Sequence, residues 1–111
     1  MSNDEKGELI HLSKENFEEV VKGTKPVLID FSATWCGPCQ MMAPVIDEIA
    51  SEETDFSTAK IDIDEAPEIA AKYHVMSVPS FLVFVNGEEK ARFLGAMSKE
   101  GLVEKVKEAT K

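Results

Sequence analysis

The chain contains the stretch Trp35-Cys36-Gly37-Pro38-Cys39. This stretch includes both cysteines of the 111-residue protein, separated by two residues. Two thiols at this spacing can interconvert between dithiol and disulfide without movement of a distant part of the fold. No third cysteine competes for either partner. The stretch therefore indicates a redox centre.

The segments on either side predict a strand that leads directly into a helix. Residues 26–32 are apolar on both faces, as in the centre of a buried sheet. A helix is predicted from Cys36 to about residue 53, with Pro38 in its first turn and Pro44 inside it, where it should cause a kink. Unpaired N–H groups and the helix dipole should lower the pKa of the Cys36 thiol. We expect Cys36 to be exposed and nucleophilic, and Cys39, one turn deeper, to be sheltered and to act as the resolving thiol.

The remaining pattern predicts an alternation of strands and helices. Further strands are expected at residues 9–12, 56–63, 80–85 and 88–94, and further helices after Ser13, Pro67 and Ser98. Asn86-Gly87 is the favoured two-residue hairpin turn, so the last two strands should pair antiparallel. The order β-α-β-α-β-α-β-β-α predicts an α/β fold with a mixed central sheet and helices on both faces. Residues 1–7 are expected to form a flexible tail, and residues 8–111 a single domain.

The amino-acid composition indicates which classes of partner the protein can bind and in which compartment it resides. The chain has 21 acidic and 12 basic residues, a formal net charge of -9, and lacks the basic face that phosphate binding requires. We therefore expect neither nucleic acid nor membrane as a partner. No apolar run reaches the roughly 18 residues of a membrane span, and residues 1–8 lack the basic and apolar parts of a signal peptide. These features predict a cytoplasmic protein, and in that compartment a structural disulfide is disfavoured.

A zinc site is an alternative use of the cysteine pair. One C-x-x-C supplies two of the four ligands that a structural zinc ion requires. The only histidines that could complete the set are His11 and His74, which are isolated in the sequence. We therefore expect no metal, and we interpret both histidines as ordinary surface or partly buried residues.

Asp30 interrupts the apolar strand on the face shared with Leu28 and Ser32. Burial of a carboxylate should raise its pKa. Because the strand leads into the cysteine turn, Asp30 could lie beneath Cys39 and accept its proton. The alternative is a strand-end aspartate that faces water or a backbone donor. Lys60 should lie near Asp30 on a neighbouring strand, unless it is a solvated edge lysine.

Pro79 and Trp35 are two further candidates for the site. A proline directly before the strong strand at residues 80–85 can be cis, which is rare and usually functional. An ordinary trans proline is equally compatible with the sequence. Trp35 could be a core aromatic, but its place beside Cys36 favours a partly exposed contact residue.

With these residues in place, the chain closely resembles the thioredoxin family over residues 8–110. The stretch from Trp35 to Cys39 is the most specific element, and the supporting residues at family spacing are Asp30, Pro44, Lys60, Asp62, Val78, Pro79, Gly87, Gly95 and Ala96. The resemblance implies the thioredoxin fold, a five-stranded sheet flanked by four helices, with Pro79 cis and facing the disulfide. It also implies a substrate groove formed by Trp35, Gly37, Pro38, Val78, Pro79, Gly95 and Ala96.

The resemblance further implies a thiol–disulfide oxidoreductase that reduces disulfides in target proteins and serves as an electron carrier. In this scheme Cys36 attacks, Cys39 resolves, Asp30 accepts the proton of Cys39 and Lys60 modulates Asp30. The backbone near Pro79 would hold the target as an added strand. Re-reduction would come from thioredoxin reductase, a flavoprotein supplied by NADPH. No cofactor is expected in the chain beyond the redox-active disulfide, and a monomer is expected.

Two other functions stay open on the sequence. One is a disulfide isomerase or oxidase, which Gly37-Pro38 disfavours because it places no cationic side chain near Cys36. The other is a redox-independent binding subunit of a partner enzyme. The chain also departs from the family pattern at four positions. Ser32 stands where many members have an aromatic residue, and Ser80 stands where threonine is usual. His74 and Ser77 stand where some members have glycine.

Overall fold

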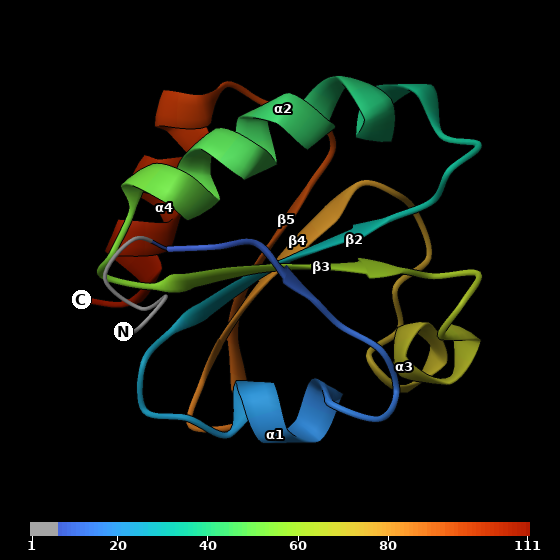
Figure 1. The fold of residues 1–111 in the computed structure, drawn as a ribbon, viewed down its shortest axis with the longest axis horizontal. Helices are drawn as coiled ribbons and strands as arrows, with labels where there is room; N and C mark the ends of the chain where they lie inside the picture. Colours follow the sequence, from blue (N-terminus) through green and yellow to red (C-terminus); the bar gives the residue numbers. More distant parts are fainter. Residues whose placement is uncertain (1–6) are drawn as a thin grey trace.

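The computed structural model of the protein describes residues 7–111, so the predicted tail at residues 1–7 lies outside the described residues except for Gly7. A five-stranded sheet forms the centre and four helices cover it (Figure 1). The strands are β1 (Ile10–His11), β2 (Val27–Ser32), β3 (Ser57–Asp62), β4 (Ser80–Val85) and β5 (Glu88–Leu94). The helices are α1 (Phe17–Val21), α2 (Gly37–Glu52), α3 (Pro67–Lys72) and α4 (Lys99–Ala109).

The sheet is mixed, with the strand order β1-β3-β2-β4-β5. The pairs β1–β3 and β3–β2 are parallel, whereas β2–β4 and β4–β5 are antiparallel. All six residues of β2 are buried, as its two-sided apolar pattern predicts. The predicted α/β class and mixed sheet are thus confirmed.

The two faces of the sheet are covered by different helices. In Figure 1, α2 and α4 lie above the sheet and α1 and α3 below it. Alternate residues of β2 point to opposite faces, so Ile29 and Phe31 pack with Phe17 of α1, while Leu28 packs with Ile46 of α2. Asp30 shares the face of Leu28 and therefore lies on the side that α2 covers. No helix in residues 7–111 combines the length and apolar character needed to cross a membrane.

The β4–β5 hairpin has the predicted bounds and the predicted turn. Asn86 and Gly87 adopt φ values of 55° and 81°, which are the left-handed conformations that a type I′ turn requires at both central positions. Because Asn and Gly adopt these conformations readily, the hairpin could be predicted from the sequence.

The start of α1 corrects one prediction. Ser13 is not the N-cap: the helix begins at Phe17, and Asn16 occupies the cap position. The Ser13 hydroxyl instead accepts a hydrogen bond from the Glu15 N–H at 3.3 Å, while the Ser13 N–H donates to Asn16 Oδ1 at 2.8 Å. These bonds form a local turn that delays the helix, a known competition between short polar side chains and helical backbone.

Candidate functional site

The two cysteines lie where β2 ends and α2 begins. Cys36 is the N-cap of α2, with extended φ and ψ of -94° and 114°, and Pro38 follows within the first turn. Cys36 and Cys39 form a disulfide with a Cα–Cα distance of 5.2 Å. The Cys39 N–H donates a hydrogen bond to Cys36 Sγ at 3.1 Å. A backbone N–H and the positive end of a helix dipole in these positions would stabilise negative charge on Cys36 Sγ once the disulfide is reduced.

The predicted difference in exposure between the cysteines is wrong for the disulfide form. Cys36 is only 5% exposed and Cys39 is 4% exposed. The bond turns Cys36 Sγ toward Cys39, and the Val78 carbonyl covers it from another side at 3.7 Å. The two sulfurs therefore differ in their place on the helix and in their hydrogen bonds, not in the area that solvent reaches.

The Val78–Pro79 peptide bond is cis, as the resemblance implied, and it lies against the disulfide. The Val78 carbonyl faces Cys36 Sγ, and it is placed to accept a hydrogen bond from the thiol when the disulfide opens. The Pro79 carbonyl accepts a hydrogen bond from the Gly95 N–H at 2.9 Å. Gly95 has φ of 89°, a conformation that side-chain-bearing residues rarely adopt. These contacts bring Val78, Pro79 and Gly95 together beside Cys36.

The rim of the disulfide is apolar and open to solvent. Trp35 is 66% exposed, as predicted, and its indole Nε1–H donates to Asp64 Oδ2 at 2.8 Å. Gly37, Pro38 and Ala96 are also exposed, and Val78 is half-buried. The residues predicted to form a groove thus lie in three segments of the chain, residues 35–38, 78–79 and 95–96.

Asp30 is almost completely buried, with 1% of its surface exposed. Neither of its carboxylate oxygens has a hydrogen-bond partner among the described residues. Burial raises the pKa of Asp30 from 3.8 to about 7, although the positive charge of Lys60 acts in the opposite direction. This carboxyl group can therefore exchange a proton near neutral pH, which is the property a general base requires.

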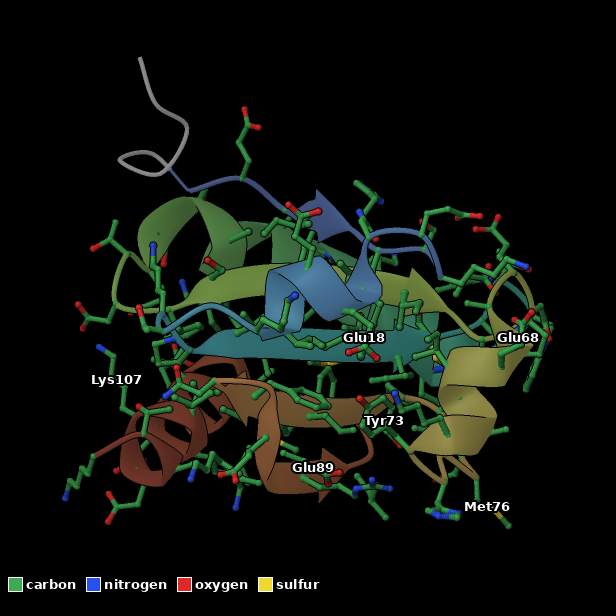
Figure 2. The ribbon with its side chains drawn as sticks, turned by 90° about the horizontal axis from the view of Figure 1, so that it is seen from below. Glu18, Glu68, Tyr73, Met76, Glu89 and Lys107 are labelled. Atoms are coloured by element: carbon green, nitrogen blue, oxygen red, sulfur yellow. A yellow bond between two sulfur atoms is a disulfide. The ribbon has the colours of Figure 1, made fainter. Side chains whose placement is uncertain are left out.

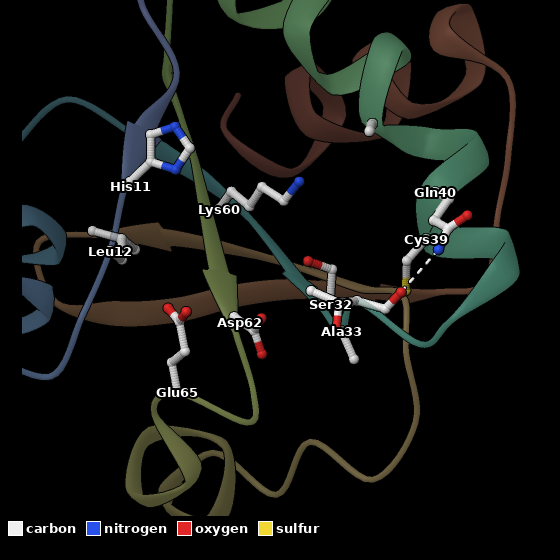
Figure 3. A pocket seen from close by; sticks show the side chains of 11 residues that line it. His11, Leu12, Ser32, Ala33, Cys39, Gln40, Lys60, Asp62 and Glu65 are labelled. Carbon is white, nitrogen blue, oxygen red and sulfur yellow. Dashed lines mark hydrogen bonds between the residues drawn. The ribbon is translucent and has the colours of Figure 1, made fainter.

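Lys60 lies directly beside Asp30, because the two residues are register partners in the parallel β2–β3 pair. It is half-buried, and it lines a cavity of about 410 Å³ together with Cys39. Figure 3 shows Lys60 and Ser32 extending into this space, with Cys39 at its far side. Ser32 follows Asp30 by two residues on the same face of β2. The cavity thus brings Cys39 and the charged neighbour of Asp30 to one space.

Three features of the site were not found from the sequence. Asp64 anchors Trp35, the cavity opens beside Ser32, and Arg92 donates hydrogen bonds to the Tyr73 and His74 carbonyls in the segment before Pro79. The two side-chain contacts join residues 29 and 19 positions apart in the chain, so no local spacing could signal them. The only available sign of the cavity was the small side chain of Ser32.

The two histidines are surface residues. His11 and His74 are both exposed and far apart in the sequence. Within residues 7–111 no group of three or more histidine, cysteine or acidic side chains is arranged to hold a metal ion. The redox-active group of the site is the disulfide itself.

Comparison with known proteins gives one consistent family. The thioredoxin family model matches residues 8–108. A thioredoxin of Mycobacterium tuberculosis is 44% identical over 105 residues, which is 93% of this chain and 90% of that protein. A bifunctional thioredoxin reductase/thioredoxin of Mycobacterium leprae is 47% identical over 88 residues, which is 78% of this chain and 19% of that protein.

The solved structures agree with the sequence matches. A mutant thioredoxin from Halobacterium salinarum superposes with a TM-score of 0.87 at 33% identity, covering 100% of this chain and 96% of that one. Thioredoxin f from spinach chloroplast gives a TM-score of 0.87 at 30% identity, covering 95% and 96% of the two chains. Both similarities extend over the sheet and the helices that carry the disulfide.

Proposed function

The chain belongs to the thioredoxin family of thiol–disulfide oxidoreductases, and we propose that it reduces disulfides in target proteins through its Cys36–Cys39 pair. The observation that carries the proposal is the placement of Cys36. Its sulfur lies at the N-cap of α2, accepts the Cys39 N–H and faces the Val78 carbonyl. The Cys39 N–H and the helix N-terminus stabilise this sulfur as a thiolate, and Cys39 lies one turn further along α2.

The first step is attack by the Cys36 thiolate on one sulfur of the target disulfide. A bond forms between Cys36 Sγ and that sulfur, the target disulfide breaks, and the second target sulfur leaves as a thiolate that takes up a proton. The helix N-terminus supports this step because it increases the fraction of Cys36 that is ionised at neutral pH.

The second step is attack by Cys39 on Cys36 Sγ. The Cys36–Cys39 disulfide forms, the mixed disulfide breaks, and the remaining target sulfur leaves reduced. Cys39 must lose its proton first, and we assign the acceptor role to Asp30, whose pKa is raised to about 7. Solvent in the cavity beside Lys60 and Cys39 is the route we propose for the proton. Lys60 favours the ionised form of Asp30 and so assists its action as a base.

The target is proposed to bind over the apolar rim. Trp35, Gly37 and Pro38 would contact it on one side, and Val78, Pro79, Gly95 and Ala96 on the other. Extended backbone of the target could pair with the polypeptide before Pro79, in the manner of an added strand. Asp64 contributes by holding the indole of Trp35 in place.

Thioredoxin-family proteins work with disulfide targets and with thioredoxin reductase, and we propose a separate reductase of this kind as the electron donor. The bifunctional Mycobacterium leprae relative supports this choice, because its name joins the two activities in one protein. We also propose that the chain acts as a monomer in the cytoplasm, where reducing conditions maintain the dithiol form.

Insulin reduction tests the proposal. The chain should catalyse reduction of insulin disulfides by NADPH in the presence of a thioredoxin reductase, and the Cys36→Ser/Cys39→Ser double variant should not. Absence of turnover with several bacterial reductases, or an undiminished rate for the double variant, would refute it. A redox potential close to that of disulfide isomerases would instead support an isomerase.

A further inference from the structure

Arg92, on β5, makes contacts that reach the segment leading to Pro79. We propose that Arg92 is a positioning residue for target recognition, because its guanidinium group holds the start of segment 73–79 and thereby places Val78 and Pro79 where a target docks. This proposal rests on the proposed reduction of protein disulfides. It adds a residue that lies outside the disulfide and its rim.

The first evidence is a pair of hydrogen bonds to backbone carbonyls. Arg92 Nη2 donates to the Tyr73 carbonyl at 2.6 Å, and Arg92 Nη1 donates to the His74 carbonyl at 3.1 Å. Both acceptors lie just past the last helical residue of α3, where carbonyl groups have lost their helical partners and carry partial negative charge. A guanidinium group suits two such acceptors because its donors form a rigid fork.

The second evidence is that Arg92 is itself held in place. Its Nε donates to Glu89 Oε2 at 2.7 Å and its Nη2 donates to Glu89 Oε1 at 3.0 Å, so the pair is bidentate. The side chains of Arg92 and Glu89 are only 29% and 28% exposed. Figure 2 shows Tyr73 and Glu89 near each other at the same side of the molecule, with Met76 further out at its edge. The guanidinium group thus has little freedom to leave the two carbonyls.

The other end of the segment is fixed from the same strand. The Gly95 N–H, one residue past the end of β5, donates to the Pro79 carbonyl at 2.9 Å. The Ser80 hydroxyl donates to the Ser77 carbonyl at 2.6 Å. Between His74, which Arg92 holds, and Ser77, Met76 is 90% exposed. The Val78 carbonyl lies 3.7 Å from Cys36 Sγ. The part of the segment that meets the disulfide therefore lies between Ser77, which Ser80 of β4 holds, and Pro79, which Gly95 holds. The Arg92 contacts fix the chain that leads into it.

Loss of the Arg92 guanidinium group should slow the reduction of protein disulfides more than the reduction of small disulfides. A protein disulfide must align with the backbone near Pro79, whereas a small disulfide only needs to reach Cys36 Sγ. Removing the guanidinium group should let the segment shift and should weaken the alignment. Misplacement of a substrate-positioning element lowers rates without touching the reacting groups.

The test compares Arg92→Met with a matched control, Lys99→Met. The Lys99 side chain is 28% exposed and is paired with Glu48 and Glu52. Its replacement therefore also removes a partly shielded cation with two carboxylate contacts, but away from segment 73–79.

Each reduced protein is mixed in single-turnover experiments with insulin and, separately, with hydroxyethyl disulfide. Arg92→Met should lower the insulin rate constant about tenfold and leave the hydroxyethyl disulfide rate constant within about twofold. Lys99→Met should change neither, and Arg92→Lys, which keeps the charge but loses the fork, should give an intermediate insulin rate constant.

Two further outcomes would overturn the positioning role of Arg92. An equal loss with both disulfides, or an insulin rate constant for Arg92→Met equal to that of Lys99→Met, would overturn the positioning role. If Arg92→Met does not fold, the same comparison is made with Arg92→Lys, and an unchanged insulin rate constant for that variant overturns the role. Failure of the unaltered protein to reduce either disulfide would refute the proposed function instead.

Discussion

Asp30 and Lys60 are register partners on the parallel strands β2 and β3, yet no ion pair joins these two side chains, both of which lie in the described part of the chain. The carboxyl group is buried and the lysine extends into the adjacent cavity. Lys60 therefore acts on Asp30 through its charge over a distance, which lowers the pKa less than burial raises it. The result is a carboxyl group that titrates near neutral pH.

The first prediction concerns stability and its dependence on pH. The pKa of Asp30 is about 7 in the folded protein, against an ordinary 3.8, so between these values the folded state holds a proton that the unfolded state releases. Stability from this group is therefore full below about pH 4 and falls as pH rises through about 7. Asp30→Asn should raise the unfolding free energy of the oxidised protein by roughly 2 to 4 kcal/mol at about pH 8, and by little at about pH 4.

Urea denaturation at both pH values measures this effect. Asp47→Asn is a suitable control, because it makes the same chemical change at an exposed aspartate of α2, where no burial of a carboxylate is relieved. Equal stability of Asp30→Asn and the unaltered protein at the higher pH would contradict the raised pKa.

The second prediction concerns the resolving step. If ionised Asp30 accepts the proton of Cys39, the single-turnover rate of insulin reduction should rise as pH increases through about 7, and Asp30→Asn should lower the rate at least about tenfold at that pH. The rate of Cys36 alkylation by iodoacetamide is the control, since it follows ionisation of Cys36 alone. Loss of the step at about pH 7 from the Asp30→Asn profile, with the pH dependence of Cys36 alkylation retained, would support the role. An unchanged rate would exclude Asp30 as the base.

The third prediction concerns His74, which has φ of 56°. A left-handed conformation is unfavourable for a residue with a Cβ atom and is natural for glycine. His74→Gly should therefore increase the unfolding free energy by about 1 kcal/mol, seen as a rise of a few degrees in Tm. His11→Gly, in a β-strand, should instead lower Tm. A fall in Tm for His74→Gly would show that the histidine side chain makes a compensating contribution.

The fourth prediction concerns the cavity beside Ser32. Ser32 is 5% exposed and lines the space of about 410 Å³ next to Cys39, so an aromatic ring at this position has room to pack. Ser32→Phe should increase the unfolding free energy by about 1 kcal/mol, as cavity-filling changes commonly do. Ser80→Phe is the contrast, because Ser80 is 1% exposed, does not line this cavity and donates to the Ser77 carbonyl. That change should destabilise the protein by roughly 1 to 3 kcal/mol. Destabilisation by both changes would mean that the cavity cannot accept a ring.

Local chemistry explains which parts of the structure could be predicted. The β4–β5 hairpin follows from Asn86-Gly87, and the buried centre of the sheet follows from the apolar run of β2. The pKa of Asp30 was predictable in direction, because a carboxylate within that run had to be buried. Each of these features depends on residues that are neighbours in the sequence.

The features that sequence reasoning missed depend on contacts or on oxidation state. The start of α1 is decided by a competition between Ser13 and Asn16 that propensity alone does not resolve. The near-equal burial of Cys36 and Cys39 arises from the disulfide and from the Val78 carbonyl. Arg92 acts on backbone carbonyls across the fold, and such acceptors carry no sequence signature.

The most direct test of the proposed reaction is to trap its intermediate. Cys39→Ser and Cys36→Ser variants are each reduced, mixed with insulin, quenched with acid and analysed by intact mass. The proposed mechanism predicts that Cys39→Ser accumulates a mixed disulfide through Cys36, because the thiol that would release the target is missing. It predicts no such adduct for Cys36→Ser. Accumulation of the adduct in Cys36→Ser, or its absence from both variants, would contradict attack by Cys36 and resolution by Cys39.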